Sequence, residues 1–384
     1  MPFSIDAVCG AARRGRLTTA HGVVETPAFM PVGTLGAVKG VTPQALAEAG
    51  AEIFLANLYH LSLRPGIDVV EALGGLHRFT GWDGPILTDS GGFQVWSLGG
   101  LRAVDADGVT FKSHLDGSPV RFTPEGVVDM QDRMEVDVAM ALDECPPWPV
   151  APGEAALSWE RTLAWARRAA AARRPGSQTA LFGIVQGSTF EDLRRAAAAA
   201  IAEVPFDGFA IGGVSVGEPA ELRRAVVEWT APALPVERPR YLMGVGYPAD
   251  ILHAVAQGVD LFDCVLPARN ARHGVLFTRD GVLKIKNARY KDDPRPPDPA
   301  CSCPLCARLS RAFLHHLMRA GELTAPVLAT LHNLRYYLDF MAEVRQAISL
   351  GALTEGFAEH RFNPLEHAGA EEIDRAGRPA GDRT

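Results

Sequence analysis

The side chains best suited to chemistry in this 384-residue chain are polar residues that follow short apolar runs. They are Asp89, Asp143, Gln186 and Asp263, together with the glycine pair Gly212-Gly213. Two carboxylates could flank one reacting carbon, where one attacks the carbon and the other moves the proton of the leaving group. A carboxylate, an amide and an exposed backbone N–H together complement the hydrogen-bonding edges of a guanine ring. A pair of aspartates alone is weak support for such a site, because polar residues at the mouth of a barrel also satisfy loop backbone.

A second chemical motif is Cys301-x-Cys303-x-x-Cys306, followed after 25 intervening residues by His332. Three thiolates and one imidazole satisfy tetrahedral zinc, and a closed four-ligand site of this kind is structural. The alternative is three surface thiols beside an unrelated histidine, which would leave adjacent cysteines open to oxidation. The spacing therefore predicts one structural Zn²⁺ per chain.

His315 and His316 compete with His332 for the fourth zinc position. A helix predicted to begin near Ala325 favours His332, because its amphipathic surface could fold back over the cysteine loop. The apolar residues of that surface are Leu331, Leu334, Leu338 and Phe340. Zinc would then clip this region of the chain to the last helix of the barrel.

Eight short apolar runs are the elements that must position the polar residues. They cover residues 28–32, 53–56, 85–87, 137–142, 181–185, 208–211, 240–243 and 261–265. A parallel strand buried on both faces reads as a continuous apolar run, and each run precedes a helix-compatible stretch, such as 42–50, 154–174 or 190–203. The pattern predicts an α/β fold, a (β/α)8 TIM barrel. Its active site should lie where the strands end, at Asn57, Asp89, Asp143, Gln186, Gly213 and Asp263.

The predicted organisation divides the chain into four parts. Residues 1–283 form the barrel body, and residues 284–335 form a zinc-binding subdomain inserted after the last strand. Residues 336–366 form the C-terminal barrel helix region, and residues 367–384 form a disordered tail with little to bury. The basic and proline-rich composition from Lys284 to Pro304 marks the start of the inserted subdomain.

Composition and charge narrow the class of protein. The chain is 47% hydrophobic and 22% charged, with no signal-peptide pattern and no run near the roughly 18 apolar residues of a membrane span. We therefore expect a cytoplasmic protein without a membrane segment. The net charge of −7 argues against general coating of nucleic acid. A local basic face is nevertheless predicted at Arg269, Arg272, Lys284, Lys286, Arg289, Lys291 and Arg295.

Several segments are similar in sequence and order to one enzyme family. They are LTDSGGFQV at 87–95, LDEC at 142–145, GIVQGS at 183–188, FDGFAIGGVSVGE at 206–218, YLMGVG at 241–246 and LFDCVLP at 261–267. With the cysteine motif and His332, they resemble tRNA-guanine transglycosylase, also called queuine tRNA-ribosyltransferase. The resemblance spans residues 10–360. It implies a (β/α)8 barrel with a zinc-bearing subdomain, and exchange of an anticodon guanine for a 7-deazaguanine base.

The resemblance assigns catalytic roles to the two candidate aspartates. It implies that Asp263 attacks C1′ of the ribose and holds the RNA covalently, while Asp89 is the general acid and base. Arg269 and Arg272 would contact the RNA backbone, although His273 replaces the asparagine usual in the family. The implied substrate is tRNA with a GUN anticodon, and the implied assembly is a homodimer. The alternative within the family is a non-catalytic tRNA-binding partner subunit, which typically lacks the catalytic aspartates that this chain retains.

The resemblance also assigns groups that read the purine. Asp143 would bind the N1 and N2 edge of the base, and Gln186 with the N–H of Gly213 would bind O6. The carbonyl of Val214 would accept from the aminomethyl group of the incoming base. This set fits guanine and its 7-deaza analogues.

The type of deazaguanine follows from the residues around the ring. Phe93 and Met243 would sandwich the base, as suits a nucleotide flipped out of its stack. Members that accept the bulky base queuine carry smaller residues where this chain has Cys145 and Val216. The chain therefore resembles the bacterial type, which uses the aminomethyl precursor preQ1, with Glu218 helping a loop adapt between the two bases. A metal-dependent barrel hydrolase is disfavoured, because the strand ends lack a histidine-rich ligand set.

Overall fold

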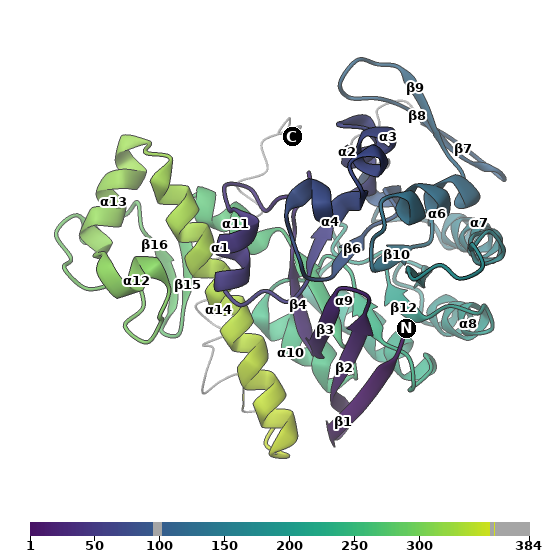
Figure 1. The fold of residues 1–384 in the computed structure, drawn as a ribbon. Helices are drawn as coiled ribbons and strands as arrows, with labels where there is room; N and C mark the ends of the chain where they lie inside the picture. Colours follow the sequence, from purple (N-terminus) through teal and green to yellow (C-terminus); the bar gives the residue numbers. More distant parts are fainter. Residues whose placement is uncertain (95–101, 354–356, 358–384) are drawn as a thin grey trace.

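The centre of the molecule is a parallel eight-stranded sheet that closes into a barrel (Figure 1). The computed structural model describes residues 1–94, 102–353 and 357. Val32 forms a parallel bridge with Leu55, and the Gly33 N–H donates to the Leu55 carbonyl at 2.6 Å, which joins the two ends of the strand order. In that order the strands are β4 (Ala28–Pro31), β14 (Leu261–Cys264), β13 (Arg240–Leu242), β12 (Gly208–Ile211), β11 (Ala180–Val185), β10 (Val138–Met140), β6 (Ile86–Thr88) and β5 (Phe54–Ala56). Each of the eight predicted runs contains or overlaps one of these strands, so the predicted barrel is confirmed.

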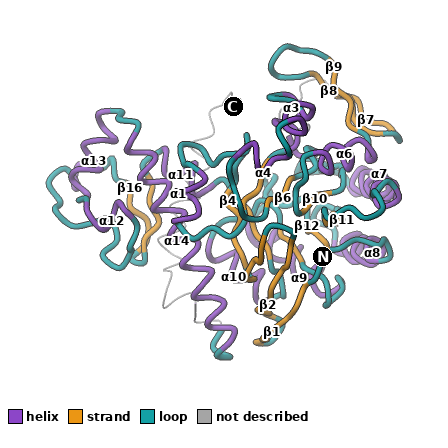
Figure 2. Tube along the Cα trace, in the orientation of Figure 1, coloured by secondary structure: helices purple, strands orange, loops and turns teal. Residues whose placement is uncertain are grey.

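Helices connect the strands and pack around the outside of the barrel (Figure 2). Helices α1 and α6 each begin with a threonine cap followed by proline. The Thr42 side chain accepts from the Ala45 N–H, and the Thr123 side chain accepts from the Gly126 N–H. The helices are α1 (Pro43–Glu48), α2 (Leu58–Leu63), α3 (Ile67–Ala72), α4 (Gly75–Thr80), α6 (Pro124–Arg133), α7 (Pro152–Ala171), α8 (Glu191–Ala202), α9 (Ala220–Thr230), the 3-10 turn η1 (Ala231–Ala233), α10 (Pro248–Ala256) and α11 (Leu266–Arg272). The predicted helices at 42–50, 154–174 and 190–203 correspond to α1, α7 and α8.

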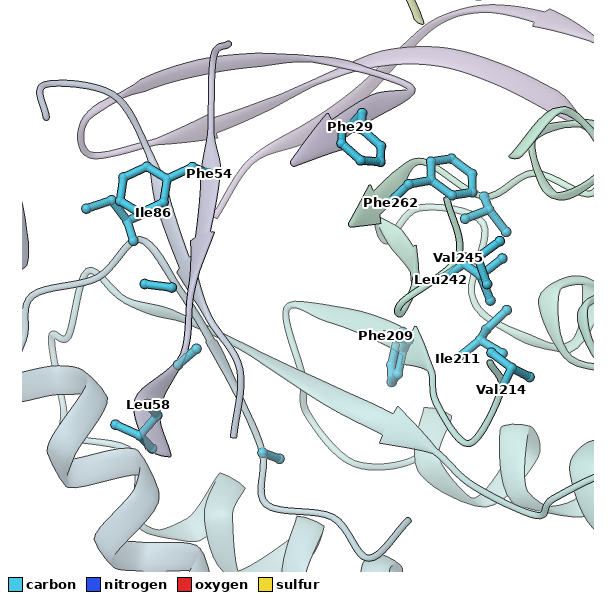
Figure 3. Packing of buried hydrophobic residues seen from close by; sticks show 14 of the residues in the cluster. Phe29, Phe54, Leu58, Ile86, Phe209, Ile211, Val214, Leu242, Val245 and Phe262 are labelled. Carbon is cyan, nitrogen blue, oxygen red and sulfur yellow. The ribbon is translucent and has the colours of Figure 1, made fainter. Parts of the chain in front are cut away.

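Strand residues alternate between two hydrophobic cores, as the period of two in a β-strand requires. We call the first the inner cluster, which fills the barrel. Its members are Leu17, Val24, Ala28, Met30, Ile53, Leu55, Leu87, Val138, Met140, Ala180, Phe182, Ile184, Ala210, Tyr241 and Leu261. The intervening residues, such as Phe29, Phe54, Phe209 and Phe262 in Figure 3, belong to an outer cluster shared with the helices.

Two antiparallel sheets that the sequence analysis did not anticipate extend the barrel. The first comprises β1 (Phe3–Cys9), β2 (Ala12–Thr19) and β3 (Gly22–Thr26), and its residues Leu17 and Val24 join the inner cluster. The second comprises β7 (Arg102–Asp105), β8 (Gly108–Lys112) and β9 (Pro119–Phe122), which project beside α3 and α6 (Figure 1). The first sheet therefore closes one end of the barrel interior.

A smaller unit lies to one side of the barrel, beyond the long helix α14 (Figure 1). It contains β15 (Val275–Thr278), β16 (Gly281–Lys284), the 3-10 turn η2 (Ala288–Tyr290), α12 (Pro304–Arg308), α13 (Arg311–Ala320) and the start of α14 (Thr324–Ser349). Its own apolar cluster includes Leu276, Ile285, Tyr290, Leu305 and Leu314. Helix α14 continues into the outer cluster through Leu334 and Phe340, so one helix is shared by both units. The predicted tail at 367–384 lies outside the described residues.

Among the helices that the structure describes, none has both the length and the apolar composition needed to cross a membrane.

Candidate active site and metal centre

Polar residues collect at the carboxyl end of the barrel because they continue the inward-facing register of the strands. Three of them lie two residues after a member of the inner cluster, namely Asp89 after Leu87, Gln186 after Ile184 and Asp263 after Leu261, and the apolar Met243 follows Tyr241 in the same way. In a strand, residues two apart share a face. The same alternation that fills the barrel with apolar side chains therefore places these residues over its mouth.

Asp263 presents one held and one open carboxylate oxygen. The Tyr241 hydroxyl donates to Oδ1 at 2.6 Å, and the Gly244 N–H donates to the same atom at 2.7 Å. Across the residues that the structure describes, Oδ2 has no hydrogen-bond partner, and the side chain is partly exposed. Burial raises the pKa of Asp263, although both donors oppose that shift by stabilising the charged form. The arrangement fixes the carboxylate while leaving Oδ2 able to contact another molecule.

Asp89 is buried, and its donors within the described part of the chain are all neutral. Its Oδ1 accepts from the N–H of Leu58 at 3.0 Å and from the N–H of Gly91 at 3.3 Å. Its Oδ2 accepts from the side-chain amides of Asn57 and Gln94. Burial raises the pKa of Asp89 to about 6, and the negative charge of the nearby Asp263 adds to the shift. This carboxyl group is therefore able to gain and lose a proton near neutral pH.

Asp143 and Gln186 are joined by a direct hydrogen bond. The Gln186 Nε2 donates to Asp143 Oδ2 at 2.7 Å, and the Ser90 hydroxyl donates to Oδ1 at 3.0 Å. Burial raises the pKa of Asp143, whose donors are both uncharged. Gln186 is buried, and its Oε1 has no hydrogen-bond partner among the residues that the structure describes. Because a buried amide oxygen without a partner is costly, this side chain is poised to bind another group.

Gly213 cannot be replaced by a larger residue without disturbing Gln186. Its φ is +66°, in the left-handed region that favours glycine, and a Cβ atom there would lie 2.3 Å from Gln186 Oε1. A Cβ at Gly212 would lie 2.6 Å from the Ile184 side chain. The glycine pair therefore lets the backbone approach the glutamine closely.

The other predicted site residues occupy different surroundings. Cys145 is buried, and burial with the charge of Asp143 raises the pKa of its thiol to about 12, so it stays protonated. Val214 is buried, Met243 packs partly buried against the inner cluster, and Phe93 is exposed. Glu218 is buried and accepts from the N–H groups of Ser215 and Val216 at 2.6 and 3.0 Å. Phe93 lies two residues before the undescribed residues 95–101.

Three partners of the carboxylates were not singled out as such from the sequence. They are Ser90, Gln94 and Tyr241. Tyr241 could have been predicted from the sequence, since it is a polar aromatic residue at an inward strand position two residues before Met243. Ser90 and Gln94 follow Asp89 within a turn and carried no signal of their own.

The cysteine motif and His332 form a compact group of four possible metal ligands. Their ligand atoms all lie within 4.8 Å of one another. His332 Nδ1 lies 3.5 Å from the Cys303 sulphur and 3.2 Å from the Cys306 sulphur. Its Nε2 lies 2.8 Å from the Phe277 carbonyl, which fixes the proton on Nε2 and leaves Nδ1 free to bind a metal. The residues therefore fit a tetrahedral ion.

The competing histidines lie elsewhere in the smaller unit. His315 Nδ1 lies 2.7 Å from the Ile285 carbonyl, and the His316 ring lies against Phe313. Neither belongs to the group of four ligands. The choice of His332 from the amphipathic helix is consistent with this geometry.

The predicted basic face begins directly after Asp263. Arg269 and Arg272 lie in the last turn of α11, the former half-buried and the latter exposed. Further along, Lys284, Lys286 and Lys291 are exposed. Arg295 is exposed but pairs with Asp293, at 2.7 Å between Nη2 and Oδ2, so it contributes less positive potential than its neighbours.

Comparison with known proteins identifies the family. The family model described as Queuine tRNA-ribosyltransferase matches residues 7–364. A protein of that name from Aromatoleum aromaticum is 57% identical over 367 residues, covering 94% of this chain and 98% of the relative. Proteins of the same name from Azoarcus sp. and Methylobacillus flagellatus are 53% and 52% identical, covering 96% and 93% of this chain and 100% and 96% of the relatives. The chain therefore belongs to the queuine tRNA-ribosyltransferase family, which confirms the resemblance and the predicted enzyme class, a pentosyltransferase.

Proposed function

We propose that this enzyme exchanges the guanine at the first anticodon position of GUN-anticodon tRNAs for preQ1, through a covalent intermediate on Asp263. The observation that carries the proposal is the pairing of two unlike carboxylates. Asp263 has one oxygen held by two donors and one open, and Asp89 beside it is buried with a pKa of about 6. One group suits attack on carbon and the other suits proton transfer.

The exchange takes place in two displacements. In the first, Asp263 Oδ2 attacks C1′ of the ribose, the C1′–N9 bond breaks, and Asp89 gives a proton to the departing guanine. In the second, N9 of preQ1 attacks C1′, the ester bond to Asp263 breaks, and Asp89 takes the proton from N9. Both carboxylates return to their starting states. Tyr241 and Gly244 keep Oδ1 fixed throughout, so that Oδ2 is the attacking atom.

The base is held by the groups around Gln186. Ionised Asp143 accepts from N1–H and N2–H of the purine, and Gly213 N–H with the Gln186 amide binds O6. Gln186 Nε2 donates one N–H to Asp143 and has a second N–H for O6, which as a carbonyl oxygen must accept. Phe93 and Met243 stack on the two faces of the ring, and the Val214 carbonyl accepts from the aminomethyl group of preQ1.

Incorporation of labelled preQ1 into a GUN-anticodon tRNA, with queuine as competitor, tests this function. We expect guanine and preQ1 to be used, because Cys145 and Val216 leave no room for the cyclopentenediol of queuine. Overpacking costs about 1–3 kcal/mol, roughly 5- to 150-fold in use of the base. Replacing both residues by smaller ones, Cys145→Ala with Val216→Gly, should weaken the exclusion. Binding of tRNA without any incorporation would instead favour a non-catalytic partner subunit, and efficient use of queuine would overturn the base assignment alone.

The proposed metal is one structural Zn²⁺ per chain, held by Cys301, Cys303, Cys306 and His332. It would fix the smaller unit to α14 and takes no part in the exchange. We expect Cys303→Ala to lose the metal and to destabilise the smaller unit more than the barrel. Cys9→Ala, which alters a half-buried thiol on β1, is the matched control for metal content and thermal unfolding. A Cys303→Ala protein with full metal content would contradict the site.

We further propose that the enzyme acts in the cytoplasm as a homodimer. In this assembly the smaller unit supplies part of the interface. Arg269, Arg272 and the exposed lysines beyond them contact tRNA phosphates. Binding to tRNA should therefore weaken steeply with rising salt.

A further inference from the structure

Arg194 is a buried cation held entirely by backbone carbonyls. It lies in the first turn of α8 and is 0% exposed. Its Nε donates to Ser188 O at 2.6 Å, Nη1 to Val185 O at 3.2 Å and Nη2 to Gly213 O at 3.3 Å. The ion pairs found among the described residues do not include it. Buried arginine without a carboxylate partner is uncommon, because desolvating the charge is costly.

The three carbonyls belong to the two loops that carry the base-reading groups. Gln186 lies between Val185 and Ser188 in the first loop. In the second loop, the Gly213 carbonyl belongs to the peptide between Gly213 and Val214. The N–H of Gly213 is assigned to O6, and the carbonyl of Val214 is assigned to the aminomethyl group. One guanidinium therefore ties both loops together beneath the purine site.

Both loops adopt backbone conformations that need support. Gly187, Ser188 and Gly213 have φ values of +130°, +49° and +66°. Residues in such conformations keep them only where surrounding contacts hold them, and for the serine the strain is real. The rigid fork of arginine is suited to hold several acceptors at fixed angles, whereas lysine carries a single flexible ammonium.

We propose that Arg194 is a positioning residue for purine recognition, which sets the Gln186 loop and the Gly213–Val214 peptide in the geometry that reads O6. The proposal rests on the assignment of these groups to the base. Burial lowers the pKa of Arg194 to about 10, so the side chain stays charged at neutral pH and donates at all three contacts. Its charge also lies near Glu218 and Cys145, inside a site rich in carboxylates.

The test compares bases that differ at one edge. In 6-thioguanine the O6 acceptor is replaced by sulphur, whereas hypoxanthine keeps O6 and lacks only the N2 amine read by Asp143. We expect Arg194→Met to reduce the preference for guanine over 6-thioguanine, measured as a ratio of inhibition constants, by about tenfold or more. The preference over hypoxanthine and the KM for tRNA should change less than about threefold. Arg195→Met is the matched control, because Arg195 is the next residue on the same helix, exposed and paired with Glu191.

A purely structural Arg194 would give another result. In that case Arg194→Met would lower the melting temperature and leave the guanine to 6-thioguanine ratio at the wild-type value, which overturns the proposal. Should Arg194→Met fail to fold, Arg194→Lys retains the charge without the fork and should show an intermediate ratio. A wild-type ratio in Arg194→Lys likewise overturns the proposal. If the wild-type enzyme itself does not distinguish the two bases, the O6 assignment fails irrespective of Arg194.

Discussion

Strands β10 and β14 each have aspartates near both ends, and the two ends of the barrel surround them differently. Asp137 precedes β10 and Asp143 follows it, whereas Asp260 precedes β14 and Asp263 lies near its end. Asp137, Asp143 and Asp260 are buried, Asp263 is partly exposed, and all four accept hydrogen bonds. The difference lies in the charge and basicity of the donors.

At the amino end of the barrel strands, the donors to the aspartates include two imidazoles and a guanidinium. Asp137 accepts from His21 Nδ1 and His77 Nε2, each at 3.0 Å, and from the Ile86 N–H at 2.9 Å. These hydrogen bonds outweigh burial and hold the pKa of Asp137 at about 2. Asp260 binds Arg13 through both of its carboxylate oxygens, although burial still raises the pKa of Asp260. These carboxylates are fully engaged by neighbouring side chains and join distant segments of the chain.

At the carboxyl end, the donors are neutral amides, hydroxyls and backbone N–H groups. Burial outweighs these donors, and the pKa values of Asp89, Asp143 and Asp263 all rise. Perturbation of this kind at the mouth of a barrel is typical of functional groups. Since the pKa of Asp260 also rises, the comparison teaches that the partners of a carboxylate, rather than the direction of its pKa shift, distinguish the aspartates available for chemistry from those that support the fold.

The largest expected effect comes from Asp263→Asn. An amide is a poor nucleophile, so exchange should fall by about 10⁶-fold, the scale for loss of a covalent nucleophile. Denaturing electrophoresis of enzyme with tRNA should show no covalent adduct. Asp260→Asn, near the opposite end of the same strand, is the matched control and should keep its activity per folded molecule. Near-normal turnover in Asp263→Asn would remove it from the role of nucleophile.

Asp89→Asn should have a smaller effect on activity. Proton transfer by a positioned side chain contributes about 10²- to 10⁴-fold, so some adduct should still form where exchange is lost. Formation of the adduct uses the protonated form of Asp89. The single-turnover rate of adduct formation by the wild-type enzyme should therefore fall as the pH rises through about 6, the pKa of Asp89. Asp89→Asn should lack this inflection, and an unchanged inflection would assign the proton to another group.

The sequence was sufficient for the barrel and for the position of three polar residues at its mouth, because both depend on local patterns. Buried parallel strands are continuous apolar runs, and their ends indicate where Asp89, Gln186 and Asp263 lie. The two antiparallel sheets were missed. In β8 (GVTFK) and β1 (FSIDAVC) polar residues interrupt the apolar ones, so neither strand is a continuous apolar run.

The partners of the aspartates could not be predicted for a different reason. His21 and His77 are 116 and 60 residues away from Asp137 in the chain, and no local pattern joins them. Asp137 and Asp143 bracket the same apolar run, so the sequence alone does not separate the carboxylate that supports the fold from the one proposed to read the base. The buried position of Arg194 could not be predicted either, since in the sequence it is one of several charged residues in an Ala- and Arg-rich helix.

The smallest effect on activity, and a clear one on stability, is expected from Asp137→Asn. The folded-state pKa of about 2 lies below the ordinary value of 3.8. The charged form is therefore favoured by folding, which contributes about 2 kcal/mol to the free energy of unfolding above pH 4. This contribution is lost as the pH falls from about 4 towards 2, where the carboxyl group takes up its proton in the folded state as well.

Urea unfolding at pH 7 and at pH 3 measures this prediction. At pH 7 we expect Asp137→Asn to lose about 2 kcal/mol relative to the wild type, with a smaller difference at pH 3 because the wild type has begun to lose the same interaction. Asp280→Asn, at the exposed turn between β15 and β16, should show little change at either pH. Exchange per folded molecule should stay within about twofold of the wild type, as surface and supporting positions generally allow. An Asp137→Asn protein that kept its stability but lost exchange would contradict the comparison. Asp137, a carboxylate held by two imidazoles at the amino end of the barrel, would then act in the reaction rather than support the fold.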